Sequence, residues 1–324
     1  MATLKKYTLL LFKILLGVAC FLFLWFKLKD QFTPEKMLEL RKTLKEPVAF
    51  NSLVFAFFLM IPNWLIESYK WKHITAGIER ISFGKAIKGV LSGLCVGNLT
   101  PGRFGEFAGR ILYFSPHNRS KVSVTHFVCG STQLFTTMVF GIICGAFWLL
   151  RSDSQSGMYQ AIFVVCCALL IGLLLVILNM EKAYAKLSGL SFMKRLNLGN
   201  VSYPQKTMLQ LIALSAFRYL VFSYQYILLL QCCGSGGTYA ELFIPVSISF
   251  MLMSALPMIS FIEVAIRASI AVVLFSPFNS NELLLVTAST LLWFINIAFP
   301  SVIGYFIILS SKIKLRELKA QKIK

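Results

Sequence analysis

Residues 85–114 read KAIKGVLSGLCVGNLTPGRFGEFAGRILYF, an apolar segment that is broken in its middle. Glycines recur at every fourth residue from Gly89 to Gly97, a small-residue stripe that lets a second helix approach closely. A helix over 85–97 would be about 20 Å long, which reaches the middle of a bilayer without crossing it. Pro101 and Gly102 then end the helix, because proline lacks the amide hydrogen and glycine accommodates the bend. The segment predicts a re-entrant hairpin or a broken helix, and hydropathy leaves two short spans open as the alternative.

A second interrupted segment, SISFMLMSALPMISFIEVAIRASIAVVLF, covers residues 247–275. It repeats three residues of the first at an offset of 156 or 157: Pro101 as Pro257, Glu106 as Glu263 and Arg110 as Arg267. The apolar runs on either side keep roughly the same spacing. This self-similarity predicts an internal duplication, with a first repeat over about 48–150 and a second over about 207–310. A chance match of three positions is the alternative.

Composition places the whole chain in a membrane. The 324 residues are 57% hydrophobic and only 14% charged, whereas a soluble domain carries about 25% charged residues. Runs long enough to cross a bilayer lie at about 7–26, 48–69, 122–150, 158–178, 208–231 and 283–310, and the interrupted stretches are 85–114 and 239–275. We therefore predict a single all-α polytopic membrane domain over 1–324, with about six full spans and two hairpins.

The basic residues set the orientation. With a cytoplasmic N-terminus and two hairpins that each return to their own side, 22 of the 32 Lys and Arg residues fall on the cytoplasmic side and seven on the outer side. The chain is then a multi-pass protein of the cytoplasmic membrane with both termini in the cytoplasm. The hairpins around Pro101 and Pro257 enter from opposite faces, as in the inverted repeats of many secondary transporters. The +19 formal charge flanks the apolar runs, which argues against nucleic-acid binding.

Two segments between spans have the pattern of interfacial structure. In the outer segment 27–47, Thr33 and Pro34 form an N-cap followed by proline at the first helical position. We predict a short helix on the outer surface there, with a solvated loop as the alternative, and a similar inner interfacial segment at 182–200.

Five ionisable residues lie in apolar surroundings: Glu106, Arg110, Arg218, Glu263 and Arg267. A charge near the bilayer centre costs about 2.5–3.5 kcal/mol on insertion scales and is usually paired. Glu106 with Arg110, and Glu263 with Arg267, could form structural ion pairs one helical turn apart. Alternatively, both pairs line a polar cavity for an anionic headgroup, in which Arg103 and Arg110 bind the anion and Glu106 holds Arg110 or exchanges a proton.

Arg218 lies about 18 Å along its helix from Lys206 and needs a buried partner, for which Glu263 is the candidate. Asn63, Glu67, Gln133 and Gln225 could line the same cavity, although single polar residues more often bond between helices. The candidate substrate-binding residues are Asn98, Pro101, Gly102, Arg103, Gly105, Glu106, Arg110, Arg218, Pro257, Glu263 and Arg267.

Enzyme and metal motifs are absent from the sequence. There is no HExxH, P-loop or GxSxG pattern, and the SxxK match at Ser82–Lys85 has no companion motif. The eight cysteines show no metal-ligand spacing. We therefore predict no catalytic residue, no metal and no cofactor.

The stretch Pro101, Gly102, Arg103, Gly105, Glu106 and Arg110 resembles the PGRxGE core, followed by arginine, of the lysylphosphatidylglycerol synthase membrane-domain family. Lys70-Trp71 resembles the basic-Trp ending of that family's second span, and the likeness runs from the first span to the last. Two features depart from it: no glycine leads into Glu263, and the usual Glu-Arg pair is missing around 129–133.

The resemblance implies movement of a lipid or lipid-linked headgroup between leaflets, by a flippase-like mechanism with alternating access. The chain ends at Lys324 without an aminoacyl-transferase domain, so we expect no lipid aminoacylation. A hypothesis from another class is a non-transporting partner that scaffolds a lipid-modifying enzyme or a glycosyltransferase.

Overall fold

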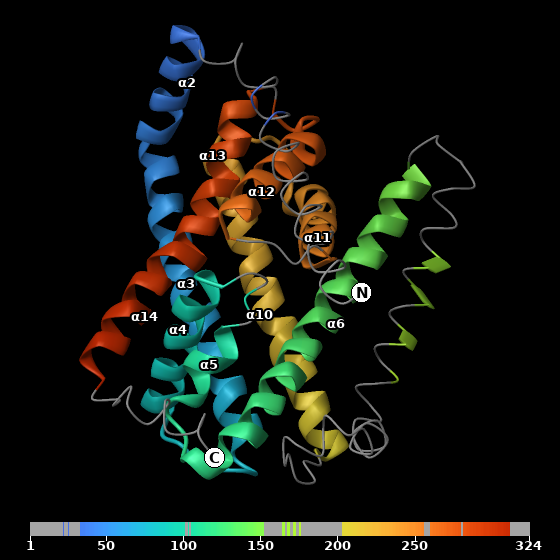
Figure 1. The fold of residues 1–324 in the computed structure, drawn as a ribbon. Helices are drawn as coiled ribbons and strands as arrows, with labels where there is room; N and C mark the ends of the chain where they lie inside the picture. Colours follow the sequence, from blue (N-terminus) through green and yellow to red (C-terminus); the bar gives the residue numbers. More distant parts are fainter. Residues whose placement is uncertain are drawn as a thin grey trace, which may run out of the picture.

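The computed structural model describes residues 33–100, 103, 105–151, 203–255, 260–279 and 281–311, with nine isolated positions between 22 and 175. The described residues form helices and the turns between them, without a strand (Figure 1). The predicted spans 7–26 and 158–178, apart from those isolated positions, and the predicted inner segment 182–200 lie outside the described residues.

Four of the described helical stretches are long and apolar enough to span a membrane: Pro47–Thr75, Pro116–Leu150, Gln205–Cys232 and Glu282–Ser310. They correspond to α3 (Pro47–Thr75), α6 (Arg119–Arg151), α10 (Gln205–Cys232) and the series α13 (Glu282–Trp293), a π-helical turn (Phe294–Ala298) and α14 (Phe299–Ser310). Each falls on a predicted span. The predicted all-α membrane protein is confirmed.

The helix that precedes the first of these spans is α2 (Pro34–Lys45). Its start matches the predicted cap: the side chain of Thr33 accepts a hydrogen bond from the backbone N–H of Lys36, and Pro34 is the first helical residue. Figure 1 shows α2 continuing beyond the upper end of α3. Glu46 interrupts the two helices because it has an extended backbone conformation and Pro47 follows it.

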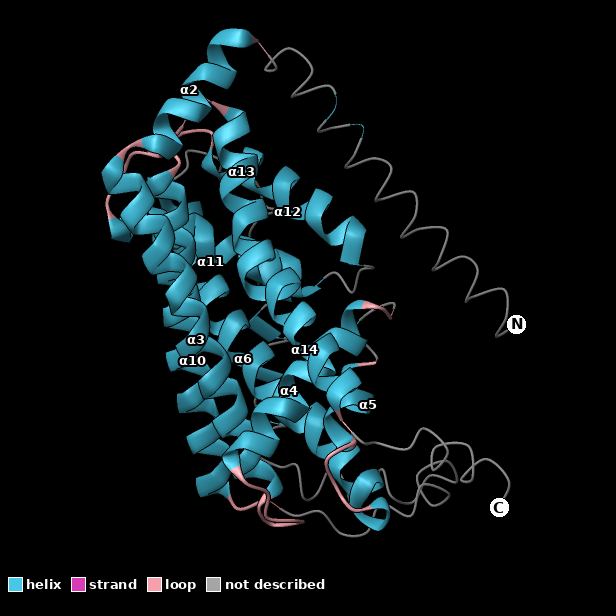
Figure 2. Ribbon diagram, turned by 90° about the vertical axis from the view of Figure 1, so that its left-hand side faces the viewer, coloured by secondary structure: helices cyan, strands magenta, loops and turns pink. Residues whose placement is uncertain are grey.

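Each interrupted segment folds into two short helices. The first contains α4 (Phe83–Asn98) and α5 (Glu106–Ile111), and the second contains α11 (Tyr239–Ala255) and α12 (Ser260–Phe275). In Figures 1 and 2 the pair α4 and α5 lies in the lower half of the molecule, and α11 and α12 lie in the upper half. The two broken segments therefore occupy opposite ends of the helix bundle.

Each hairpin, α4 with α5 and α11 with α12, packs against a helix from the other half of the chain. α3 packs along α10, while α4 packs against α14 and α11 packs against α6. A glycine lies at each of the two crossings: a Cβ on Gly304 of α14 would collide with the carbonyl of Leu91, and one on Gly141 of α6 would collide with the side chain of Met251. The first helix of each hairpin is thus held by a helix from the other half of the chain.

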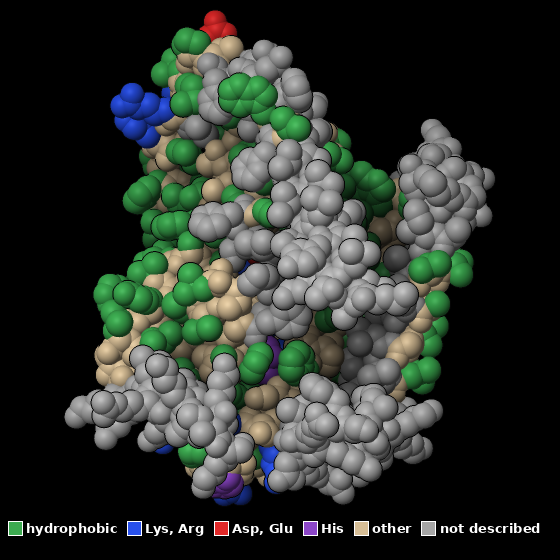
Figure 3. Space-filling model, viewed as in Figure 1, with side chains coloured by type: hydrophobic (Ala, Val, Ile, Leu, Met, Phe, Trp, Pro, Cys, Tyr) green, Lys and Arg blue, Asp and Glu red, His purple; other side chains and the backbone are tan. Residues whose placement is uncertain are grey.

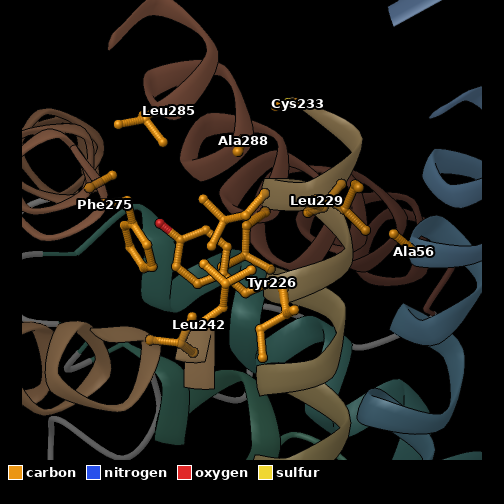
Figure 4. Packing of buried hydrophobic residues seen from close by; sticks show 14 of the residues in the cluster. Ala56, Tyr226, Leu229, Cys233, Leu242, Phe275, Leu285 and Ala288 are labelled. Atoms are coloured by element: carbon orange, nitrogen blue, oxygen red, sulfur yellow. The ribbon is translucent and has the colours of Figure 1, made fainter. Parts of the chain in front are cut away.

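Apolar packing holds the upper half together. A buried cluster joins α3, α10, α11, α12 and α13, and Figure 4 shows Tyr226 and Leu229 of α10 among Leu242, Phe275 and Leu285. The face in Figure 3 exposes hydrophobic side chains over its middle, with Lys and Arg near its ends, as expected for a surface that lipid surrounds. α3 contributes Phe50, Phe55 and Phe58 to the exposed apolar side chains.

At the lower end of the bundle, the side chain of Glu79 links two of the turns between helices. Its carboxylate accepts hydrogen bonds from the backbone N–H of Ser115, at 3.1 Å, and from the Asn118 amide, at 2.8 Å. Partial burial alone would raise the pKa of Glu79, but these hydrogen bonds outweigh it and hold the pKa below its usual value. The ionised carboxylate therefore links the α3–α4 turn to the turn that precedes α6.

Candidate functional site

A cavity of about 330 Å³ lies where the two halves meet. Residues of α3, α6, α10, α11, α12, the π-helical turn and the segment before α5 line it: Asn63, Trp64, Arg103, Gln133, Thr137, Arg218, Tyr219, Phe222, Phe250, Met253, Ser254, Glu263, Arg267, Asn296 and Ile297. Its charged residues are three arginines and one glutamate, a formal excess of two positive charges. All four belong to the predicted candidate site.

Arg103 connects the two hairpins. One guanidinium nitrogen of Arg103 donates to both carboxylate oxygens of Glu263, each at 3.1 Å. Glu263 also accepts from Arg267, one turn further along α12, at 2.7 Å. A residue before α5 and a residue of α12 therefore form an ion pair across the cavity, although 160 positions separate them in the sequence.

The backbone of Arg103 is unusual. Its φ angle is +57°, and it has the one positive φ of a non-glycine residue within the described ranges. A side chain in this left-handed region costs about 1–2 kcal/mol. Such strain concentrates at functional sites, where the surrounding structure enforces it.

A second charged cluster lies next to the cavity and centres on Glu67 of α3. Its carboxylate contacts Arg110 at 2.9 Å, Arg218 at 3.3 Å and Lys70 at 3.6 Å. Arg110 also pairs with Glu106 and lies 5.1 Å from the centre of the Trp71 ring. Because Arg218 lines the cavity, Glu67 connects the cavity to the first hairpin.

The predicted partner of Arg218 was wrong. Arg218 pairs with Glu67 and not with Glu263, and it donates hydrogen bonds to Asn63 at 2.8 Å and Gln133 at 3.3 Å. Glu263 is held by Arg103 and Arg267 instead. The distance along the helix predicted how deep Arg218 lies in the membrane. It carried no information about which residue of another helix lies beside Arg218 at that depth.

Buried amides extend the network from Arg218. The amide of Asn63 donates to Asn296 at 3.0 Å, and Asn296 donates to Gln225 at 2.9 Å. Asn296 belongs to the π-helical turn, a local widening that often marks a functional site. Pro300 follows in the next turn and cannot donate a backbone hydrogen bond. Three helices are therefore joined by side-chain amides at the level of the cavity.

The predicted glycine stripe faces α5. A Cβ on Gly93 would lie 2.7 Å from the carbonyl oxygen of Glu106, and one on Gly97 would lie 3.1 Å from its side chain. This close approach places Glu106 and Arg110 beside α4, where they pair with each other. Gly105 caps α5, and its N–H donates to Thr100 at 2.7 Å. The stripe was thus a sound indicator of the hairpin's packing.

Of the other candidate residues, Asn98 and Arg110 are described by the structure and the three at the proline breaks are not. Asn98 ends α4 and hydrogen-bonds Ser301 of α14, so its contact lies at the crossing of the two halves. Arg110 is only 3% exposed and holds two carboxylates, so it is not the accessible anion contact that was expected. Pro101, Gly102 and Pro257 lie outside the described residues.

Several site residues were missed. The predicted span 48–69 leaves Lys70 outside the membrane, whereas it is fully buried in α3 beside Glu67. Its spacing of three residues from Glu67 was the available signal. Asn296 and Trp64 lie in apolar runs, and nothing in their local sequence distinguishes them from packing residues.

The cavity can bind an anion. Of the described residues, none is paired with Nε or Nη1 of Arg103, Nη1 of Arg267 or Nη2 of Arg218, while their other guanidinium nitrogens are engaged. Guanidinium N–H groups match phosphate and carboxylate oxygens. Within the described ranges, no group of three or more His, Cys, Asp or Glu side chains could hold a metal ion.

Comparison with known protein families places most of the chain in one family. The family described as the lysylphosphatidylglycerol synthase TM region matches residues 10–304. No curated protein sequence matches the chain.

Proposed function

Because the chain belongs to the lysylphosphatidylglycerol synthase transmembrane-region family, we propose that it moves a lipid or lipid-linked headgroup between the leaflets of a membrane. The headgroup is anionic and binds in the cavity between the two hairpins. Arg103, Arg218 and Arg267 bind its charge, and the protein acts as a transporter and not as an enzyme.

One observation carries this proposal: three arginines with unpaired N–H groups line a cavity in the middle of an apolar helix bundle. Charges in a membrane are costly, and they usually mark a substrate or ion pathway. Each of the three arginines contacts a carboxylate, but the carboxylates are shared. Arg103 and Arg267 share Glu263, and Arg218 shares Glu67 with two further basic residues. Here the cavity keeps an excess of positive charge, which an anionic headgroup would neutralise.

The packing of the hairpins supports alternating access between two inverted repeats. The hairpins lie at opposite ends of the bundle. The first helix of each packs against the last helix of the other repeat, α4 against α14 and α11 against α6. In this mechanism the ion pair between Arg103 and Glu263 forms when the hairpins meet and opens when they part. Arg103 is 32% exposed, so it can exchange Glu263 for a phosphate, while the buried Glu263 keeps Arg267 as its partner.

The proposal is tested with Arg103→Gln in purified protein reconstituted into vesicles that contain a fluorescent anionic phospholipid. The rate of movement between leaflets is measured by quenching the fluorescence of the outer leaflet. This rate is expected to fall at least about tenfold, since a charge-assisted hydrogen bond contributes about 1.5–3 kcal/mol. Glu106→Gln is expected to slow movement as well, because it removes one of the two carboxylates that hold Arg110. Arg80→Gln removes the same charge from an exposed turn and serves as the control.

Two outcomes would contradict the proposal. Movement at the parent rate by both Arg103→Gln and Glu106→Gln would remove the cavity from the mechanism. A purified parent protein that moves no lipid, but retains a copurifying enzyme, would favour the scaffold hypothesis instead.

A further inference from the structure

We propose that the cavity selects anionic headgroups that carry no amino acid, and that it rejects the lysylated lipid after which its family is described. This inference rests on the proposed function and names the substrate class of the same cavity. It follows from the donors and acceptors that the cavity presents. A lysyl group brings two ammonium groups, which only donate hydrogen bonds and need acceptors or carboxylates.

The carboxylates are already occupied. The apolar segments contain four acidic residues, of which Glu241 lies exposed in the first turn of α11 and three lie inside the bundle: Glu67, Glu106 and Glu263. Glu67 is held by Lys70, Arg110 and Arg218, and Glu106 by Arg110. Glu263, the one that lines the cavity, accepts from Arg103 and Arg267. With its two ammonium groups and one phosphate, the lysylated headgroup carries a net charge of about +1, which adds to the positive excess of the cavity, whereas an unmodified phosphate headgroup reduces that excess.

The amide oxygens that line the cavity are engaged as well. Those of Asn63 and Gln133 accept from Arg218, and that of Asn296 accepts from Asn63. Thr137 and Ser254 donate their protons to backbone carbonyls and keep weak, neutral acceptor capacity. Among its described residues, the cavity therefore presents mostly N–H donors, which suit a phosphate and oppose an ammonium.

Aromatic rings can bind a cation through their faces, and each of the four rings that line this cavity already has at least one face covered. Arg218 lies 5.3 Å from the centre of the Trp64 ring. Phe250 stacks with Phe222 and Tyr226, at centroid distances of 4.9 and 5.8 Å. A cation needs an open ring face within about 6 Å of its centroid. The covered faces reduce the area that these rings offer to an ammonium.

The test compares phosphatidylglycerol with lysylphosphatidylglycerol, each as a trace fluorescent analogue in phosphatidylcholine vesicles that contain the purified full chain. Phosphatidylglycerol is expected to move at least about tenfold faster, which corresponds to about 1.4 kcal/mol of selectivity. Equal rates, or faster movement of the lysylated lipid, would overturn the inference and leave the proposed function in place. If neither lipid moves, the proposed function fails for phospholipids, and the inference fails with it.

Arg267→Gln changes the selectivity in a defined direction. It removes one of the two arginines from Glu263 and lowers the positive excess of the cavity, so the rate ratio of lysylated to unmodified lipid is expected to rise about tenfold. Arg80→Gln, with the same chemical change on an exposed turn, is expected to leave the ratio unchanged. A ratio that is equal in both variants would contradict the assignment of selectivity to Glu263 and its arginines.

Discussion

The residue with the most consequences is Glu67, which forms ion pairs with three basic side chains on three segments. Lys70 is fully buried and Arg110 is 3% exposed, so neither can turn to water when the carboxylate is lost. Burying an ion pair gains little net stability, but removing one partner leaves an uncompensated charge. Glu67 therefore makes the buried arginine and lysine tolerable in an apolar bundle.

Glu67→Gln is expected to destabilise the protein by about 3–5 kcal/mol, the usual cost of breaking a buried pair. Thermal unfolding of the purified protein in detergent micelles measures this as a lower Tm. Glu46→Gln is the matched control, because Glu46 lies exposed between α2 and α3. Equal Tm values for the two variants would mean that Lys70 and Arg110 need no carboxylate at Glu67.

At the level of elements, the first hairpin depends on glycine. α4 and α5 approach so closely that a Cβ on Gly109 would lie 2.5 Å from the backbone nitrogen of Gly93. This contact positions Glu106 and Arg110, because both lie on the short α5. The hairpin's packing and the position of its charged residues therefore have one physical origin.

Gly109→Ala is expected to cost about 1–3 kcal/mol, since overpacking against backbone atoms cannot be relieved by a rotamer change. Gly130→Ala in α6 is the control: nothing lies within 4 Å of its Cβ position, and alanine favours a helix by up to about 1 kcal/mol. Thermal unfolding in micelles should show a lower Tm for Gly109→Ala and an unchanged or higher Tm for Gly130→Ala. A destabilisation of similar size in both would contradict the close approach.

At the level of the whole molecule, charge is unequal between the two ends of the bundle. The segments around 70–88 and 110–121 are basic, whereas the upper turns at 233–238 and 276–281 contain no Lys or Arg. Positively charged loops stay in the cytoplasm. The turn between α3 and α4 is thus expected inside the cell, and the turn between α10 and α11 outside.

Cysteine labelling in intact cells tests this orientation. Thr238→Cys is expected to react with a membrane-impermeant maleimide, and Arg80→Cys only after the membrane is permeabilised, because both side chains are exposed but lie in turns at opposite ends. The native cysteines at 95, 129, 144, 232 and 233 are buried, and the parent chain gives the background. The reverse labelling pattern would invert the topology.

The parts that sequence predicted were those set by local chemistry. The hydrophobic runs gave the four described spans, Thr33 and Pro34 gave the start of α2, and the stripe from Gly89 to Gly97 gave the face that α5 covers. The i,i+4 spacing also predicted the pairs of Glu106 with Arg110 and Glu263 with Arg267. Helix geometry alone brings these residues together.

The amino-acid sequence by itself determined that this chain is a helical membrane protein with two interrupted segments and buried charges, since hydropathy, proline and glycine act within a few residues. Only the tertiary structure decided how those charges pair. Arg103 meets Glu263 across 160 positions, and Arg218 meets Glu67 and not Glu263. Such contacts depend on which helices pack side by side, and the sequence pattern of one segment does not record the partner that tertiary packing brings to it.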